Sequence, residues 1–313
     1  MQFFSRANID FITNRKYGYM FSGTLLLIGF ISLILRGGPN YGIDFKGGVS
    51  IRVQMAQNVT IDDVRKSLSA IGYGDAELKE SRQEQGNTVK EEYIVRVPAS
   101  TESSSAGDSV LTQLRADYGD SSVVVRSVES VGPKIGNELK RAAIYSILFA
   151  LLIILIYISW RFELRFAVGA IIPLFHDVLI TLGIFSVLNL EISLAVVAAF
   201  LTIVGYSLND TIVVFDRIRE NLRTLRREKY DVVINKSINE TLSRTIITSL
   251  TTLFVVLILY FLGGSVIHNF AFALLVGVVI GTYSSIFVAS PILIEWENWH
   301  QTHNKIEKKK KKR

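Results

Sequence analysis

Six long apolar runs, separated by polar segments, constrain the fold of this chain more than any other feature. They cover residues 19–35, 142–160, 166–188, 192–215, 245–262 and 270–294. Each run is near the roughly 20 residues that a helix needs to cross the hydrocarbon core of a bilayer. Of the 313 residues, 49% are hydrophobic and only 20% are charged. The sequence therefore predicts a polytopic α-helical membrane protein with six transmembrane helices.

The apolar runs divide the chain into five parts. No small-residue cleavage site follows the first run, so we interpret it as an uncleaved transmembrane helix rather than a signal peptide. The expected parts are a cytoplasmic N-terminus at 1–18, the first transmembrane helix at 19–36, an extracytoplasmic domain at 37–138, transmembrane helices two to six at 139–294 with a cytoplasmic loop at 217–243, and a basic cytoplasmic tail at 295–313.

The segment 37–138 has the pattern of a small soluble domain. Alternating apolar residues predict strands, and apolar residues at helical spacing predict helices. The strands are expected at 50–54, 76–80, 92–97 and 122–131, the helices at 60–71 and 109–118, and a flexible loop at 101–108. The order β-α-β-β-α-β is that of a ferredoxin-like α+β domain.

The distribution of Lys and Arg sets the expected orientation. They occur at Arg6, Arg15 and Lys16, at Arg161 and Arg165, throughout the loop after Asp216, and in the tail at Lys305 and 308–313. The alternate short loops at 189–191 and 263–268 have none. Because positive residues stay in the cytoplasm, both termini are expected there and the domain at 37–138 outside. The chain has no cysteine, which excludes disulfides and thiolate-ligated metals.

Asp210 is the leading candidate for a functional residue. It lies between two apolar runs in the predicted fourth span, where a charged side chain costs roughly 2.5–3.5 kcal/mol. Arg244 opens the predicted fifth span, which runs antiparallel to the fourth, so a salt bridge between the two residues is expected. Burial favours the neutral carboxyl and a neighbouring guanidinium favours the charged one, so this site is suited to respond to a proton. The alternative for Asp210 is a carboxylate that snorkels to the interface or has a purely structural partner. The alternative for Arg244 is an ordinary positively charged anchor at the cytoplasmic end of its span.

Asp177 is a second acid, near the middle of the predicted third span. With no cation nearby in sequence, it is expected to be protonated or hydrogen-bonded to a neighbouring helix. It either shares a proton with Asp210, if their spans touch, or serves as a structural hydrogen-bonding group. The adjacent His176 is not expected to share its face of the helix.

Two glycine-rich features have structural interpretations. Gly42, Asp44, Gly47 and Gly48 lie in a loop between the first span and the external domain, where we expect a flexible hinge. Small residues recur every fourth position in the sixth span, and they predict a helix-packing stripe, either inside the subunit or against a partner. The stripe is Ala273, Gly277, Gly281, Ser285 and Ala289.

No metal site or catalytic residue is expected from the sequence. His300 and His303 are an isolated pair in the polar tail.

Several motifs resemble those of the SecF branch of the SecD/SecF family, within the resistance–nodulation–division superfamily. The resemblance covers residues 36–291. It rests on GIDFKGGV at 42–49, VGPKIGNEL at 131–139, HDV at 176–178, VGYSLNDTIVVFDRIREN at 204–221, RTIITSLTTLFVVLILYFLGG at 244–264 and FALLVGVVIGTYSSIFVASP at 272–291.

The resemblance implies a non-enzymatic subunit that couples the proton-motive force to late steps of protein export across the bacterial inner membrane. Protons are then the coupling ion, with no cofactor. The implied partners are SecD, the SecYEG channel, YajC and YidC, the translocating unfolded polypeptide and membrane lipids, with no nucleic acid. Asp210 and Arg244 match the proton-pathway positions of the family, and Asp177 is added to that pathway as a further acid.

Two other functions remain open at this stage. Half of a proton-driven small-molecule exporter of the same superfamily is one, although about 100 external residues leave little room for a substrate cleft. An intramembrane aspartyl protease is the other, because two acids lie in spans. Its G-x-G-D signature is missing, since Ser207-Leu208-Asn209 precedes Asp210.

Overall fold

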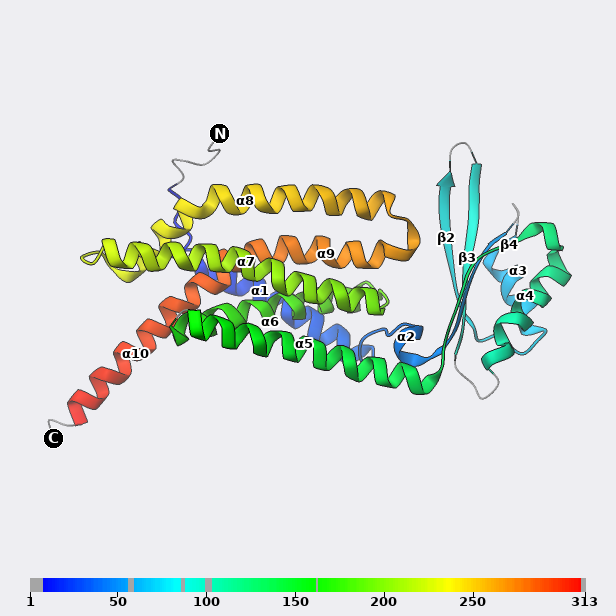
Figure 1. Cartoon of the computed structure of the whole chain (residues 1–313), viewed down its shortest axis with the longest axis horizontal. Coiled ribbons are helices and arrows are strands. Elements are labelled where there is room, and N and C mark those ends of the chain that lie inside the picture. The colour runs from blue at the N-terminus through cyan, green and yellow to red at the C-terminus, as the bar shows by residue number, and fades with distance from the viewer. Residues whose placement is uncertain (1–7, 56–58, 86–87, 99–102, 162, 311–313) are drawn as a thin grey trace. The chain divides into compact units, whose positions relative to one another are not determined.

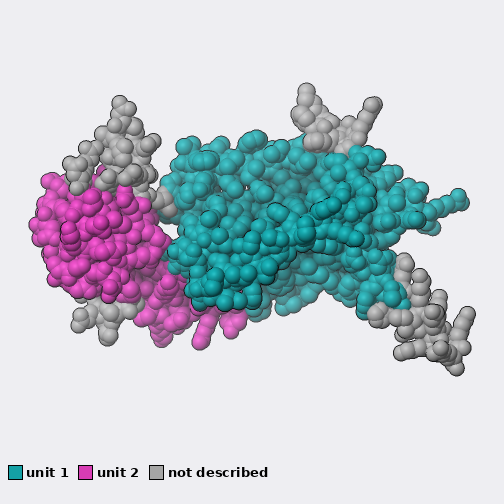
Figure 2. Space-filling view, turned by 180° about the vertical axis from the view of Figure 1, so that it is seen from behind, with its two compact units in different colours: residues 1–40, 146–313 teal, residues 41–145 magenta. Residues whose placement is uncertain are grey.

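The structure is a computed structural model that describes residues 8–55, 59–85, 88–98, 103–161 and 163–310. It divides into two compact units (Figure 2). The first, here called the membrane unit, contains residues 1–40 and 146–313, and the second, the external unit, contains residues 41–145. The unit boundary lies within a long helix, a few residues after the border expected at 138.

The membrane unit consists of long helices (Figure 1). They are α1 (Arg15–Leu35), α5 (Pro133–Arg161), α6 (Leu164–Val187), α7 (Leu194–Thr224), α8 (Tyr230–Leu262), α9 (Gly264–Ser284), a π-helical turn at Ser285–Ala289, and α10 (Ser290–Lys310). Six segments of the described chain are long and apolar enough to cross a membrane, and the last of them runs from Val266 to His300. This confirms the predicted number of transmembrane helices.

The segment predicted as a cytoplasmic loop at 217–243 is mostly helical rather than irregular, and its cytoplasmic location stays a prediction. α7 continues to Thr224 and α8 begins at Tyr230. The extension is held by polar contacts, with Arg217 Nε donating to Glu240 Oε2 at 2.6 Å and Asn221 Nδ2 donating to the same oxygen at 2.7 Å. These contacts between the two helices outweigh the high polarity that suggested a loop.

Three helices form the interior of the membrane unit and three lie outside. In α6, α7 and the α9–α10 span, 56%, 50% and 61% of the most apolar window is buried, against 17% in each of α1, α5 and α8. The outer helices therefore present most of their apolar surface away from the unit.

The small-residue stripe allows α9 to pack closely against α7, which decides between the two partners that the sequence left open. A Cβ atom at Gly277 would lie 2.2 Å from Ile203 Cγ1, and one at Gly281 would lie 3.1 Å from Ser207 Cβ. The stripe thus packs inside the subunit. Ser285 begins the π-helical turn, a local widening that often marks functional sites.

The external unit has the predicted ferredoxin-like arrangement. Its strands are β1 (Gly48–Met55), β2 (Glu77–Gln85), β3 (Thr88–Pro98) and β4 (Val123–Val131), and its helices are α2 (Ile43–Lys46), α3 (Ile61–Ser69) and α4 (Ser103–Tyr118). The sheet order is β2-β3-β1-β4, and each neighbouring pair is antiparallel. This is the split β-α-β topology that the alternation of elements predicts.

The loop predicted at 101–108 is wrong for the part that the structure describes. Residues 101–102 lie outside the described residues, and α4 already begins at Ser103. Ala106 is fully buried, and a Cβ atom at Gly107 would lie 3.3 Å from Val49 Cγ1 on β1. Packing against the sheet thus favours a helix where the local sequence suggested a flexible segment.

The glycine loop before β1 contains one turn of helix. Gly42 precedes α2, and Gly47 and Gly48 follow it with φ angles of 76° and 131°. These left-handed values favour glycine, which explains the residue choice. Phe45 is buried, and a Cβ atom at Gly136 would lie 3.0 Å from its carbonyl oxygen. The loop is therefore an ordered turn in the structure, and its role as a hinge stays a prediction.

Thr60 and Asp63 form a capping box at the start of α3. The Asp63 N–H donates to Thr60 Oγ1, and the Thr60 N–H and hydroxyl donate to Asp63 Oδ2 at 3.1 and 2.7 Å. Hydrogen bonds from the Thr60 side chain and backbone lower the pKa of Asp63. The Asp63 carboxylate therefore contributes fully to the stability of the folded state above its ordinary pKa of about 3.9. That contribution is lost as the pH falls through the lowered pKa of the folded state.

Replacement of Thr60 by Ala should loosen α3 and reduce the acid dependence of its stability. We expect the α3 amides of the full chain to exchange about fivefold faster with solvent near neutral pH, the effect of a typical N-cap. Hydrogen exchange with mass spectrometry measures this, and Thr112→Ala on the exposed face of α4 is the control. Equal exchange of α3 in Thr60→Ala and the unmodified chain would contradict the capping role.

Candidate proton site

Asp210 lies on α7 and is only 3% exposed. Its carboxyl receives one long hydrogen bond, from Ser249 Oγ on α8 to Oδ2 at 3.4 Å. Ser249 Oγ in turn accepts a hydrogen bond of 2.6 Å from Thr282 Oγ1 on α9. The carboxyl is thus buried among three helices, with Ser249 as its one hydrogen-bond partner among the described residues.

The predicted salt bridge between Asp210 and Arg244 is not formed in the structure. Among the described residues, no ion pair within 4.0 Å joins them, and Arg244 is exposed. The reason is the helix register. Asp210 is level with Ser249, which follows Arg244 by five residues, or about 7.5 Å along α8 at 1.5 Å per residue. The guanidinium is therefore displaced along α8 from the Asp210 carboxyl rather than paired with it.

Buried hydroxyl groups without hydrogen-bond partners occur near Asp210. In the described part of the chain, Tyr206 Oη, Thr211 Oγ1 and Thr245 Oγ1 are all buried and unpaired. Tyr206 lies one helical turn before Asp210 and Thr211 directly follows it, while Thr245 lies one turn before Ser249 on α8. Unpaired buried hydroxyls are the groups that bind internal water in proteins. Several buried hydroxyls on α7 and α8 are therefore available to bind internal water.

Asp177 lies on α6 and is 1% exposed. Two hydroxyls from neighbouring helices donate to its Oδ2, Ser207 Oγ on α7 at 2.6 Å and Ser284 Oγ on α9 at 2.7 Å. The expectation that it bonds to a neighbouring helix is thus confirmed. No hydrogen bond between described residues joins Asp177 directly to Asp210, although Ser207 lies one turn before Asp210 on the same helix.

The expectation that His176 points away from Asp177 is wrong. His176 Nδ1 lies 2.8 Å from Asp177 Oδ1, and Nε2 lies 2.9 Å from Ser22 Oγ on α1. The Cβ atoms of adjacent helical residues do diverge, but the imidazole is long enough to reach the carboxyl beside it. In the sequence, His176 was marked only by the HDV motif. Its contact with Ser22 comes from a helix that is distant in sequence.

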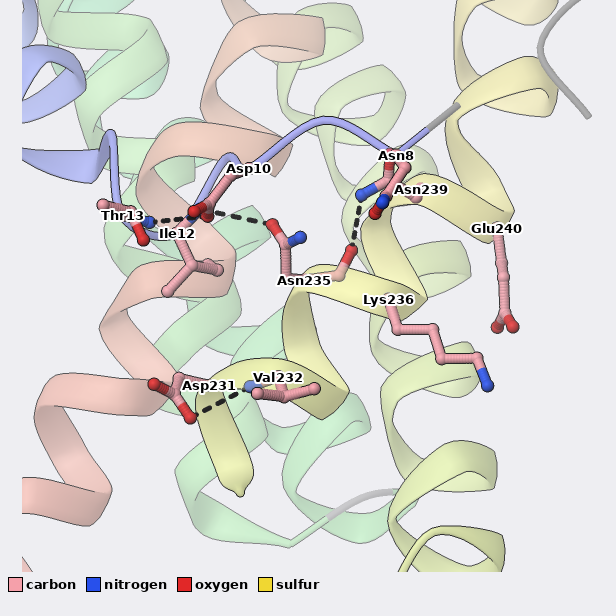
Figure 3. A pocket seen from close by; sticks show the side chains of 10 residues that line it. All are labelled: Asn8, Asp10, Ile12, Thr13, Asp231, Val232, Asn235, Lys236, Asn239 and Glu240. Atoms are coloured by element: carbon pink, nitrogen blue, oxygen red, sulfur yellow. Dashed lines mark hydrogen bonds between the residues drawn. The ribbon is translucent and has the colours of Figure 1, made fainter. Parts of the chain in front are cut away.

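A hollow of about 560 Å³ lies beside the N-terminal segment and the first turns of α8 (Figure 3). Asn235 and Asn239 hold that segment by its backbone, since the Ile9 carbonyl accepts from both amides at 3.0 and 2.9 Å. The hollow is lined by Asn8, Asp10, Ile12, Thr13, Asp231, Val232, Asn235, Lys236, Asn239 and Glu240. It contains none of the residues that the sequence suggested, and its mixed charges favour no particular ligand.

Sequence comparison identifies the family to which these features belong. The family described as "Protein export membrane protein SecD/SecF, C-terminal" matches residues 110–299, and the "SecD/SecF GG Motif" matches residues 32–59, which include the glycine loop. The chain is 48% identical to the protein translocase subunit SecF of Rhodothermus marinus, over 94% of this chain and 95% of that one. It is 46% identical to the SecF subunit of Haemophilus influenzae, over 90% and 84%.

Solved structures agree with this result. The fold is similar to the crystal structure of SecDF, a translocon-associated membrane protein from Thermus thermophilus, with a TM-score of 0.83 and 38% identity over 95% of this chain. A SecDF structure in a super-membrane-facing form gives a TM-score of 0.68. The chain spans 40% of the length of each SecDF chain. On these identities and coverage, the chain belongs to the SecF family of protein translocase subunits.

Proposed function

We propose that this protein couples the proton-motive force to late steps of protein export, with Asp210 as the residue that binds and releases the proton. The observation that carries the proposal is the setting of Asp210. Its carboxyl is 3% exposed, and within the described part of the chain it accepts a single long hydrogen bond and has buried hydroxyls without partners close to it in sequence. An ionisable residue kept in a membrane span is costly unless it has a use, and a proton site is the use that fits these neighbours.

Arg244 acts on Asp210 through its charge rather than through a direct salt bridge. While Asp210 is ionised, it attracts the nearby guanidinium. Protonation removes that attraction, and α7 and α8 are then free to shift against each other. Asp177 is a second carboxyl of the same membrane unit. It is bonded to Ser207, which lies one helical turn before Asp210 on α7.

The partner that completes the membrane part is a SecD-like chain. Polar residues of two membrane spans face outward, where lipid contact is unfavourable. Asn209 and Thr202 on α7 and Arg244 on α8 are exposed, and a Cβ atom at Gly205 would meet nothing within 4 Å. The solved SecDF chains contain more than this chain spans, and we infer that a SecD-like half covers this surface. SecYEG, YajC, YidC, membrane lipids and the exported unfolded polypeptide are the further partners.

The protein is a multi-pass protein of the inner membrane, as its six apolar helices and its family indicate. We place both termini in the cytoplasm because the Lys and Arg residues gather on the loops of that side. The external unit is then outside the cytoplasm, where the exported chain emerges. We assign the protein no catalytic step, because its role is to transmit the energy of proton flow.

Reconstituted vesicles test this proposal. Export is started by SecA and ATP through SecYEG in vesicles that also contain this chain and its SecD-like partner. ATP is then removed, and a proton gradient is applied. We expect the gradient to increase the release of partly exported chains, and only when this protein is present. Equal release with and without the gradient would contradict the proposal.

A further inference from the structure

A buried polar network joins α1, α6, α7 and α9 in a part of the membrane unit that the site at Asp210 does not use. Its centre is the pair His176 and Asp177, which are 7% and 1% exposed. The pair contacts Ser22 of α1 through His176, and Ser207 of α7 and Ser284 of α9 through Asp177. All three contacts are within hydrogen-bond distance, which allows the protons of the network to be assigned from the chemistry of each group.

The assignment begins at a backbone carbonyl. Tyr283 Oη on α9 lies 2.6 Å from the carbonyl oxygen of Gly18 on α1. A carbonyl oxygen only accepts hydrogen bonds, so the Tyr283 hydroxyl donates to it. Ser22 Oγ lies 3.0 Å from Tyr283 Oη. Since the tyrosine proton is already used, Ser22 must donate its own proton to Tyr283.

The direction of these bonds fixes the state of one imidazole nitrogen. Ser22 has a single hydroxyl proton, which Tyr283 accepts. His176 Nε2, 2.9 Å from Ser22 Oγ, must therefore be the donor of that hydrogen bond, since otherwise two lone pairs would face each other. Nε2 of His176 thus carries a hydrogen.

The other end of the network places a second proton. Ser207 and Ser284 both donate to Oδ2 of Asp177, and Oδ1 faces His176 Nδ1 at 2.8 Å. One proton must lie between Nδ1 and Oδ1, as either an imidazolium beside a carboxylate or a neutral imidazole beside a carboxylic acid. The pair has no net charge in either form, which suits its position in the membrane. In the described network, Tyr283 is the one further titratable group that faces the pair.

We propose that His176 and Asp177 form a second proton-holding site, separate from Asp210, in which Tyr283 and Ser22 keep His176 Nε2 protonated and one proton is shared between Nδ1 and Asp177. Tyr283 and Ser22 are positioning residues in this site, because they act through the imidazole. The proposal rests on the geometry of the network and does not require the coupling role of Asp210. The same bonds attach α1 to the three inner spans.

The proposal is tested by nitrogen NMR of the full chain with ¹⁵N-labelled histidine in lipid nanodiscs. The chain has four histidines, and replacement of the other three by Gln leaves His176 as the sole source of signal. We expect the nitrogen signal of Nε2 to be of the protonated type, and the signal of Nδ1 to be that of a nitrogen sharing a proton with Asp177. An unprotonated-type Nε2 signal in this otherwise unmodified chain overturns the proposal.

The variant Asp177→Asn provides a second, directional test. Asparagine has no acidic proton to share, so the neutral imidazole must then keep its hydrogen on Nε2 and accept at Nδ1 from the amide. We expect the Nδ1 signal to move to the unprotonated type while Nε2 stays unchanged. The matched control Asp210→Asn should leave both His176 signals as they were. A protonated Nδ1 with an unprotonated Nε2 in Asp177→Asn overturns the assigned direction, whatever the export assay shows for Asp210.

Discussion

Replacement of Asp210 by Asn is expected to abolish the part of export that the proton gradient drives. Asparagine has nearly the same size as aspartate, and its amide oxygen can still accept the hydrogen bond from Ser249. It cannot bind or release a proton in this range of pH. The packing of α7 against α8 should therefore survive while the response to the gradient is lost, and the ATP-driven insertion by SecA should stay unchanged.

The reconstituted export assay measures both parts in one preparation. Asp216→Asn is the matched control, because Asp216 is exposed on the same helix and should tolerate the same chemical change. Asp210→Glu keeps an ionisable carboxyl and should retain part of the gradient-driven release. Full gradient-driven release by Asp210→Asn, in protein that is folded and bound to its partner, would remove Asp210 from the mechanism.

Replacement of Gly29 by Ala should produce a large loss of stability in the membrane unit. α1 and α6 are in close contact where Gly29 faces Gly183, and a Cβ atom at Gly29 would lie 2.7 Å from the Cα atom of Gly183. Both partners of this contact are backbone, so no side chain can rotate away and the helices must separate. Overpacking usually costs about 1–3 kcal/mol of folding stability, because the surrounding side chains relax partly. At Gly29 the surrounding atoms are backbone and cannot relax by a change of rotamer, so we expect a loss at the upper end of this range.

The control for this prediction is Gly23→Ala on the same helix. Nothing lies within 4 Å of a Cβ atom at Gly23, so the substitution should only gain helix propensity, up to about 1 kcal/mol. Unfolding in detergent, followed by loss of helical signal, compares the two variants. Gly29→Ala gains the same helix propensity as the control. A net loss of stability in Gly29→Ala therefore shows that the steric cost at the α1–α6 contact exceeds that gain. Equal stability of the two variants would contradict the close contact between α1 and α6.

The sequence predicted the elements of the fold well where a single periodicity decided them. The six spans and the β-α-β-β-α-β order follow from apolar patterns, and both are present. The errors lie where contacts with other elements outweigh local composition. Residues 103–108 are helical because Ala106 and Gly107 pack against the sheet, and the polar segment after Asp216 is helical because Arg217 and Asn221 bond to Glu240.

The candidate proton site shows more clearly that contacts between distant elements cannot be predicted from local sequence. A buried acid in a span identified Asp210, and the small-residue stripe predicted a close helix contact without saying which helix it involves. The relation of Asp210 to Arg244 depends on the register of two antiparallel helices, which spacing within each helix does not determine. The role of His176 depends on Ser22 and Tyr283, more than 100 residues away on either side. Neither relation leaves a signal in a single sequence.

The protonation of Asp210 itself is the central claim, and infrared difference spectroscopy measures it directly. Vesicles that contain the protein and its SecD-like partner are exposed to a proton gradient, and the carboxyl band that disappears in Asp210→Asn is followed. The account predicts that this band reports a neutral carboxyl when protons enter from outside and a carboxylate when the gradient is removed. A carboxyl that stays in one form under both conditions, while the gradient still drives export, would contradict it.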